Sequence, residues 1–393
     1  MGARLKSFAL ATIAVFAFVA IVFFHANSEK NNGRPESDAL SSLPTSASQV
    51  AQVASSKNSA PTSSTSAIIK SKEAPLAKGT KNPTLEPQSN VPPQTLVTRL
   101  ESPYTFGTRS FDEINVSTRA ALVNILCMPR SGGTFRPTSG SGVLIDPRGV
   151  ILTNAHVAQY VLLASDQRVN LSCIIRGKSP ASPMWNAEVL YIPSIWVNDH
   201  AQDLNAERAK STGEHDYALL HITSNVDDSP TASPVSFLPV ESREKITFPG
   251  DSVLVAAYPA EFVGGAIATN NLYSVSSVTT IKQLLTFETG AVDLFSVGGV
   301  LEAQSGSSGG AVVNAWNYLV GIITTTSDGA TTAERDLHVT TLDYINRDIK
   351  VQTGKSLGEF LSGDLAVTAA IFNTQEAPDL IDKFISKITP GNN

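Results

Sequence analysis

Three short segments of the chain carry residue types that together can hydrolyse an acyl bond. His156 follows a short apolar run, Asp216 directly precedes another, and Ser308 lies in the glycine-rich stretch 306–310, Gly-Ser-Ser-Gly-Gly. A serine hydroxyl becomes a nucleophile when an imidazole removes its proton, and a carboxylate can hold that imidazole in place. Because a single histidine, a strand-edge aspartate or a Gly/Ser turn is usually structural, the hypothesis depends on all three segments together.

The glycine-rich stretch can also supply an oxyanion hole. Glycines allow a tight turn that aims the backbone N–H groups of Gly306 and Ser308 at one point. Along the chain the three residues run His, Asp, Ser. Chymotrypsin-like proteases have this order, whereas subtilisins and α/β-hydrolases have different ones.

The segments around His156, Asp216 and Ser308 resemble the three signature blocks of trypsin-like serine peptidases, particularly the bacterial HtrA/Deg branch. The sequence reads TNAHV at 153–157, DYALL at 216–220 and GSSGG at 306–310. The resemblance extends over about residues 117–350, including further runs at 140–145, 250–254, 258–259, 309–314 and 319–323. It implies a nucleophile at Ser308, a general base at His156 and an orienting carboxylate at Asp216. Its G-x-S-G-G register selects Ser308 over Ser307.

The same resemblance implies a pocket for the P1 side chain of a protein or peptide substrate. Its walls would include Thr324, Thr325, Thr326 and the residues before Ser308. Glu302 stands where trypsin has its specificity aspartate, which suggests a basic P1 residue. A β-branched side chain at Thr326 should restrict the depth of the pocket, so we expect small or medium apolar P1 residues instead.

The sequence departs from the family pattern at two places, and each departure leads to an expectation. Ser307 stands where digestive members have the aspartate that pairs with a freed N-terminus, so we expect no such activation. The residues after Lys350 are too few for the PDZ domain of HtrA-like enzymes. Relatives of that branch often trimerise, and the sequence leaves the formation of a homo-oligomer open.

The sequence predicts an all-β fold of the chymotrypsin type, with two six-stranded β-barrels. Short runs rich in Val, Ile, Leu, Thr and Tyr alternate with turn residues, and no βαβ alternation appears. We expect a peptidase domain over residues 104–350, with barrels at about 115–225 and 240–345. Helical character at 342–350 and 357–388 predicts a short helical tail over residues 351–393.

The N-terminal part differs from the rest of the chain in amino-acid composition. Arg4 and Lys6 precede an apolar run at residues 8–24, which predicts a signal anchor or a signal peptide within 1–26, and Phe24 near a potential cleavage site favours the uncleaved anchor. The catalytic domain would then be membrane-anchored by a single pass and lie outside the cytoplasm, in the periplasm or the extracellular space. Residues 27–103 contain no aromatic residue and are rich in Ser, Thr and Pro, which predicts a disordered linker or a glycosylated stalk.

Charge and cysteine content bear on partners and cofactors. The net charge is −6 although residues 27–100 are basic, so the folded part is acidic, which argues against nucleic-acid binding. No cofactor or metal is expected, because the histidines other than His156 lack metal-ligand spacing. Cys127 and Cys173 match no metal motif and could form a disulfide or remain two buried thiols.

Three other functions remain open at this stage. A pseudo-peptidase would use the same fold only to bind proteins, since fold alone does not imply activity. A stalk-and-head surface protein would show no loss of phenotype in Ser308→Ala. An esterase is disfavoured because residues 306–310 satisfy G-x-S-x-G without a following helix signal.

Overall fold

The computed structural model describes residues 103–130, 135–205, 212–261, 268–287, 290–327 and 329–388. The predicted anchor at 8–24 and nearly all of the predicted linker lie outside these residues. Within the described ranges, no helix has both the length and the apolar character needed to cross a membrane.

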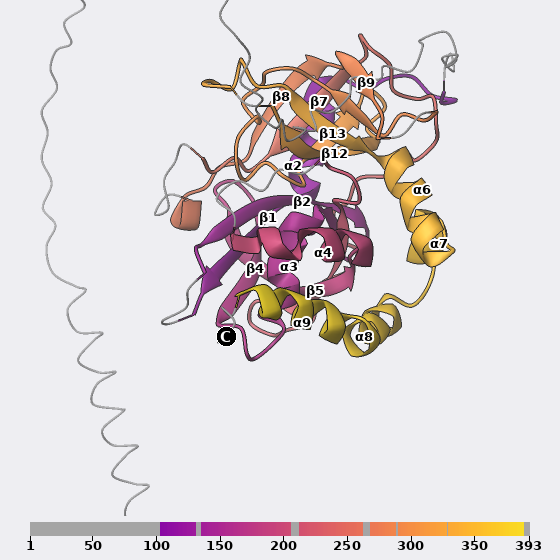
Figure 1. Ribbon diagram of the computed structural model, residues 1–393. Helices are drawn as coiled ribbons and strands as arrows, with labels where there is room; N and C mark the ends of the chain where they lie inside the picture. Colours follow the sequence, from indigo (N-terminus) through magenta and orange to yellow (C-terminus); the bar gives the residue numbers. More distant parts are fainter. Residues whose placement is uncertain are drawn as a thin grey trace, which may run out of the picture. The chain divides into compact units, whose positions relative to one another are not determined.

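The first half of the described chain forms a closed six-stranded barrel (Figure 1). Its strands pair in the order β1-β2-β3-β6-β5-β4, and every neighbouring pair is antiparallel. The barrel predicted for residues 115–225 is therefore present. Its strands are β1 (Leu122–Pro129), β2 (Thr138–Asp146), β3 (Val150–Thr153), β4 (Leu171–Gly177), β5 (Ser182–Tyr191) and β6 (Ala218–Asn225).

The hairpin between β2 and β3 leads directly to one predicted site residue. The chain turns at Asp146–Gly149, where Gly149 has a φ of 91° that favours glycine. Strand β3 then ends at Thr153, and helix α3 (Ala155–Ala164) begins two residues later. The β-rich run at 142–155 thus forms two strands and the start of a helix, because a D-P-R-G turn interrupts it.

The second half forms one open sheet of seven strands rather than the predicted second closed barrel of six. The strand order is β8-β7-β11-β12-β13-β10-β9. Strands β8 and β9 are consecutive in sequence but lie at opposite edges, joined only by Ile281 and Lys282. This short connection requires the sheet to curl until its edges approach each other, although no ladder closes it. The strands are β7 (Ser252–Ala257), β8 (Val275–Thr280), β9 (Gln283–Leu285), β10 (Leu294–Ser296), β11 (Ala311–Asn314), β12 (Leu319–Thr326) and β13 (Leu337–Thr341).

Helices flank the two sheets. Helix α2 (Phe111–Ala121) precedes β1 and begins with a capping box, in which Ser110 and Glu113 satisfy each other's backbone N–H groups. Helix α4 (Ser194–His200) and the 3₁₀ turn η2 (Ala201–Asn205) follow β5. These helices do not appear in the sequence-based prediction, which followed the β-rich runs alone.

The predicted C-terminal helices are present and pack on the first barrel. They are α6 (Leu342–Thr353), α7 (Leu357–Leu361), α8 (Leu365–Gln375) and α9 (Ala377–Ile388). Helix α6 continues directly from β13, whereas α8 lies against β5 and α9 against α4 and η2 (Figure 1). Phe372, Leu380 and Phe384 are buried in the same apolar core as the barrel strands. The tail is therefore an integral layer of the fold.

A disulfide joins Cys127 of β1 to Cys173 of β4. The two residues are direct cross-strand partners, with a separation of 46 in sequence. Of the two alternatives that the sequence left open, the structure has the bonded pair.

Candidate active site

His156 occupies the first turn of α3, immediately after β3. Asn154 is the N-cap residue of this helix, and its extended backbone redirects the chain from strand to helix. The imidazole is partly accessible, with 32% of the side chain exposed. The abrupt strand-to-helix junction therefore places the histidine at the rim of the first barrel.

Asp216 holds His156 through two hydrogen bonds. The His156 Nδ1 atom lies 2.7 Å from Asp216 Oδ2, and the His156 backbone N–H donates to Asp216 Oδ1 at 3.0 Å. Asp216 is fully buried. Burial opposes protonation of His156, but the charge and hydrogen bond of Asp216 outweigh it and raise the pKa of His156 above its usual value.

Asn154 links the turn that carries Asp216 to the second sheet. Its Nδ2 group donates to the backbone carbonyl of Asp216 at 2.8 Å and to Thr324 Oγ1 at 3.3 Å. The Thr324 hydroxyl lies 2.6 Å from that of Thr340 on β13. Asn154 was not among the residues singled out from the sequence, because a helix N-cap asparagine has no distinctive sequence signal.

Ser308 lies in the turn before β11, and its backbone is tied to the first barrel. The N–H of Ser141 on β2 donates to the Ser308 carbonyl at 2.8 Å, and the Ser141 hydroxyl donates to the Gly306 carbonyl at 2.8 Å. The Thr153 hydroxyl donates to the Ser141 carbonyl at 2.7 Å. Since Thr153 is three residues before His156, these bonds bring the Ser308 loop against the strand pair that ends at the histidine.

The loop backbone leaves two N–H groups free at the position predicted for an oxyanion hole. Neither the N–H of Gly306 nor that of Ser308 donates to any residue that the structure describes. The Ser305 carbonyl accepts from Ala260 N–H at 2.8 Å. Because the C=O and N–H of a trans peptide point in opposite directions, the Gly306 N–H points away from Ala260.

Glycines are required at two positions of this loop. Gly306 and Gly309 have φ values of 93° and 83°. A Cβ atom on Gly309 would lie 2.2 Å from the Ser141 carbonyl oxygen, and one on Gly306 would lie 2.9 Å from the Tyr258 carbonyl oxygen. Close packing therefore excludes a side chain at both positions, against β2 at Gly309 and against the segment that follows β7 at Gly306.

The four residues predicted to bind substrate differ in accessibility. Glu302 and Thr324 are buried, Thr325 is partly buried and Thr326 is exposed. The Thr325 hydroxyl lies 3.3 Å from His338 Nδ1. Only the Thr326 side chain of this set is freely available to another molecule.

Glu302 lies six residues before Ser308, and its carboxyl group is fully buried. Neither carboxyl oxygen makes a hydrogen bond of good geometry to the described residues. Burial raises the pKa of Glu302, and its own backbone N–H, the nearby Ser277 hydroxyl and the charge of Arg119 on α2 only partly offset this effect. The neighbouring Ser307 hydroxyl is likewise buried without a partner.

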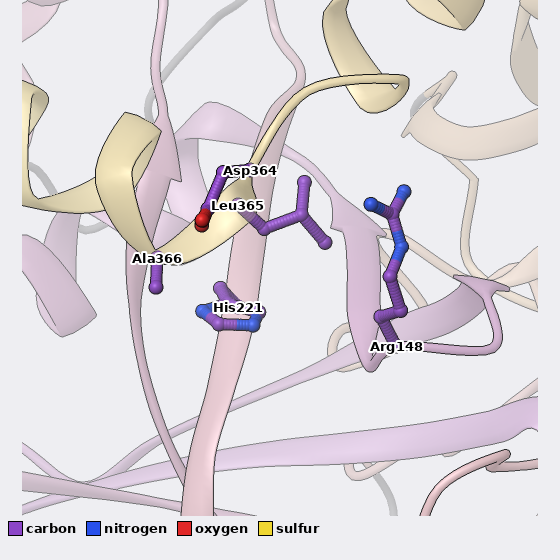
Figure 2. Close-up of a pocket in the computed structure, with 5 residues that line it drawn as sticks. All are labelled: Arg148, His221, Asp364, Leu365 and Ala366. Carbon is purple, nitrogen blue, oxygen red and sulfur yellow. The ribbon is translucent and has the colours of Figure 1, made fainter.

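A pocket of about 400 Å³ lies away from these residues, where the C-terminal helices meet the first barrel. Figure 2 shows Arg148 from the β2–β3 turn, His221 from β6, and the start of α8 around it. The Arg148 guanidinium is bound to Asp146 and to the carbonyls of Leu361 and Gly363. No residue predicted for the active site lines this pocket.

The described residues contain no cluster of three or more His, Cys, Asp or Glu side chains able to hold a metal ion.

Comparison with known proteins agrees with this geometry. Residues 140–322 match the family model of the trypsin-like peptidase domain. No curated protein gives a significant match to the chain. The matched residues begin in β2, include His156, Asp216 and Ser308, and end in β12. This part of the chain, which includes strands of the closed β-barrel and of the curled sheet, is therefore similar to a trypsin-like peptidase domain.

Proposed function

We propose that the protein is a serine endopeptidase that uses His156, Asp216 and Ser308 as a catalytic triad. The observation that carries the proposal is the pair of hydrogen bonds that Asp216 accepts from the ring and the backbone of His156. Because Asp216 occupies Nδ1, the remaining ring nitrogen, Nε2, is the one that takes the proton from a nucleophile. The trypsin-like domain supports a reaction on protein or peptide substrates.

In this proposal Ser308 Oγ attacks the scissile carbonyl while His156 Nε2 removes its proton. The tetrahedral oxyanion accepts hydrogen bonds from the N–H groups of Gly306 and Ser308. His156 then donates the proton to the leaving amine, which leaves an acyl-enzyme on Ser308. A water molecule, activated by His156, hydrolyses this ester and regenerates the enzyme.

Labelling with a fluorophosphonate tests the proposal on the full-length chain. We expect one adduct at Ser308, lost in both Ser308→Ala and His156→Ala. Ser307→Ala is the matched control, because its hydroxyl is next in sequence but buried without a partner. Absence of an adduct on folded protein would overturn the peptidase proposal and leave a protein-binding module built on the same fold.

Small or medium apolar P1 residues are the proposed preference. The exposed Thr326 side chain is β-branched, and the buried carboxyl of Glu302 has Arg119 as its neighbouring charge. A peptide library with varied P1 residues tests this, with Ala, Val and Leu expected to exceed Lys and Arg. Preferential cleavage after Lys or Arg, lost in Glu302→Gln, would instead assign Glu302 to the pocket.

An extracytoplasmic location and a membrane anchor complete the proposal. The Cys127–Cys173 disulfide supports an oxidising compartment, since such bonds are rare in the cytosol. The basic residues before the apolar run at 8–24 support an anchor with the catalytic domain exported. Like the HtrA/Deg branch that its motifs resemble, the enzyme would process or remove exported proteins. Fractionation of cells that produce the full-length chain, with protease protection, tests the location.

A further inference from the structure

A second histidine–aspartate pair lies next to Asp216 and has no part in the proposed chemistry. His215 directly precedes Asp216, and its Nδ1 atom lies 3.0 Å from both carboxylate oxygens of Asp348 on α6. The backbone N–H of His215 donates to the Tyr344 hydroxyl at 2.9 Å. Two successive turns of α6 therefore hold one residue of the turn that carries Asp216.

This turn has little freedom to move on its own. His215 has a φ of 57°, a left-handed conformation that is uncommon for residues other than glycine. Gly213, with a φ of 90°, packs so closely that a Cβ atom would lie 2.9 Å from the Thr324 side chain. The Asp216 N–H donates to the Gly213 carbonyl at 3.3 Å, and the Tyr217 N–H to the His215 carbonyl at 3.0 Å. A displacement of His215 would therefore move Asp216.

A chain of two hydrogen bonds orients the Asp348 carboxylate that contacts His215. Gln352 donates from Nε2 to Asp348 Oδ2 at 2.6 Å, and the Tyr191 hydroxyl on β5 donates to Gln352 Oε1 at 3.2 Å. The side chain of Asp348 is only 9% exposed. A buried, oriented charge of this kind makes a stronger and more directional contact than a surface ion pair.

Helix α6 belongs to the second sheet by connectivity, because it continues from β13 without a linker. His215 belongs to the first barrel, since β6 begins three residues later at Ala218. The contact therefore joins the two halves immediately behind Asp216. The proposed triad also spans both halves, with Ser308 before β11 and His156 after β3.

We propose that Asp348 and Tyr344 act as positioning residues, which hold His215 and thereby fix the Asp216 carboxylate against His156. The inference rests on the proposed function, because it concerns how the same triad is aligned. Asp216 must meet both the ring and the backbone N–H of His156, so a small displacement breaks at least one bond. A misplacement of about 1 Å in an active site can cost roughly 100-fold in rate.

Three acidic groups near His215 favour its protonated form: Asp348 on α6, Glu214 in the same turn at 3.8 Å, and Asp199 on α4. The Tyr344 hydroxyl also faces the ring, at 3.4 Å from Nδ1. The hydrogen bond to Asp348 is the main reason that the pKa of His215 is raised, with burial opposing it. The contact is thus an ion pair over a wider pH range than it would be for an ordinary histidine.

The test compares Asp348→Asn with wild-type full-length protein in fluorophosphonate inactivation rates across pH. We expect the rate constant of Asp348→Asn to fall roughly 10- to 100-fold. The acid limb of its profile should also move to lower pH, because a displaced Asp216 raises the pKa of His156 less. Asp343→Asn is the matched control on the same helix, since Asp343 pairs with Arg347 and does not touch the turn.

The inactivation rate, its pH profile and the melting temperature together distinguish a positioning role of Asp348 from a purely stabilising one. A purely stabilising ion pair would lower the melting temperature of Asp348→Asn but leave the rate and acid limb of the folded protein unchanged. That result, with labelled wild type, would overturn the inference alone. An unlabelled wild type would overturn the proposed function and, with it, the inference, because no reacting histidine would remain to be positioned.

Discussion

At the residue scale, the protonation of His156 is governed by one buried carboxylate. Asp216 is excluded from solvent and directs both of its oxygens to the same histidine. Its negative charge favours the imidazolium that forms when the nucleophile loses its proton. In the proposed mechanism the carboxylate therefore supports both the orientation of the imidazole and the charged form that results from proton transfer.

Asp216→Asn should separate these contributions. We expect the fluorophosphonate inactivation rate to fall by about 10³- to 10⁴-fold, because an amide holds the imidazole in the wrong tautomer. The acid limb should move to lower pH, since the charge that raises the pKa of His156 is gone. Asp203→Asn is the control, because Asp203 pairs with His200 in the same way away from the site. An unchanged rate and acid limb would remove Asp216 from the triad.

Glu302 should make stability depend on pH in the opposite sense from a paired carboxylate. Its folded-state pKa is raised by burial, so folding opposes its ionisation. Below the unfolded pKa of 4.5, Glu302 costs no stability. The destabilisation grows as pH rises through the folded pKa, and it persists at higher pH. Glu302→Gln should therefore raise the melting temperature at pH 8 but not at pH 4. Melting curves of Glu302→Gln that equal those of the wild type at both pH 4 and pH 8 would contradict this account.

At the element scale, the loop before β11 is shaped by contact with β2. Ser141 on β2 meets the carbonyls of both Gly306 and Ser308. Its hydroxyl also accepts a hydrogen bond from Tyr258 N–H at 2.9 Å. One small, fully buried serine therefore connects the first barrel to two segments of the second sheet. The G-S-G run at 140–142 was recognised only as a resemblance, without this role.

Gly309→Ala tests the fit between this loop and β2. The added Cβ atom would meet the Ser141 carbonyl at 2.2 Å in a left-handed conformation. We expect a loss of at least about 2 kcal/mol in unfolding free energy, together with loss of labelling. Gly358→Ala on α7 is the control, because its Cβ atom meets nothing within 4 Å and alanine favours helix. Denaturant unfolding measures the unfolding free energy of both variants. Equal values for the two would contradict the close packing of this loop against β2.

At the scale of the whole molecule, the C-terminal helices complete the first barrel. They return from the second sheet and bury apolar side chains on the outer face of β5 and on α4. Polar contacts reinforce this packing, including Asn373 Nδ2 to Glu188 Oε2 at 2.8 Å. The first barrel and the tail should therefore unfold together.

Phe384→Ala tests whether the last helix is part of the core. Phe384 is 0% exposed, so we expect a loss of about 3–5 kcal/mol in unfolding free energy. Val367→Ala on α8 should change stability by no more than about 0.5 kcal/mol, because Val367 is 54% exposed. A single unfolding transition is expected in both variants. A separate early transition for Phe384→Ala would show a tail that folds independently.

Local sequence was sufficient for the features that depend on neighbouring residues. Alternating apolar runs predicted most of the strands, and the helical tail followed from residues 342–350 and 357–388. The blocks around His156, Asp216 and Ser308 were found because glycine requirements and strand boundaries depend on a few consecutive residues. Helices α2 and α3 were missed, since their sequences also resemble the ends of adjoining strands.

Contacts between distant segments were decided only by the tertiary structure. Whether β8 and β9, the two edges of the second sheet, pair with each other depends on how the whole sheet curls, which strand propensities do not encode. The Cys127–Cys173 bond depends on the register of β1 and β4. Ser141, Asn154 and Asp348 became part of the site through hydrogen bonds to residues far along the chain. Sequence by itself determined which groups could react, whereas packing decided what holds them, because side-chain geometry depends on which surfaces the folded chain brings together.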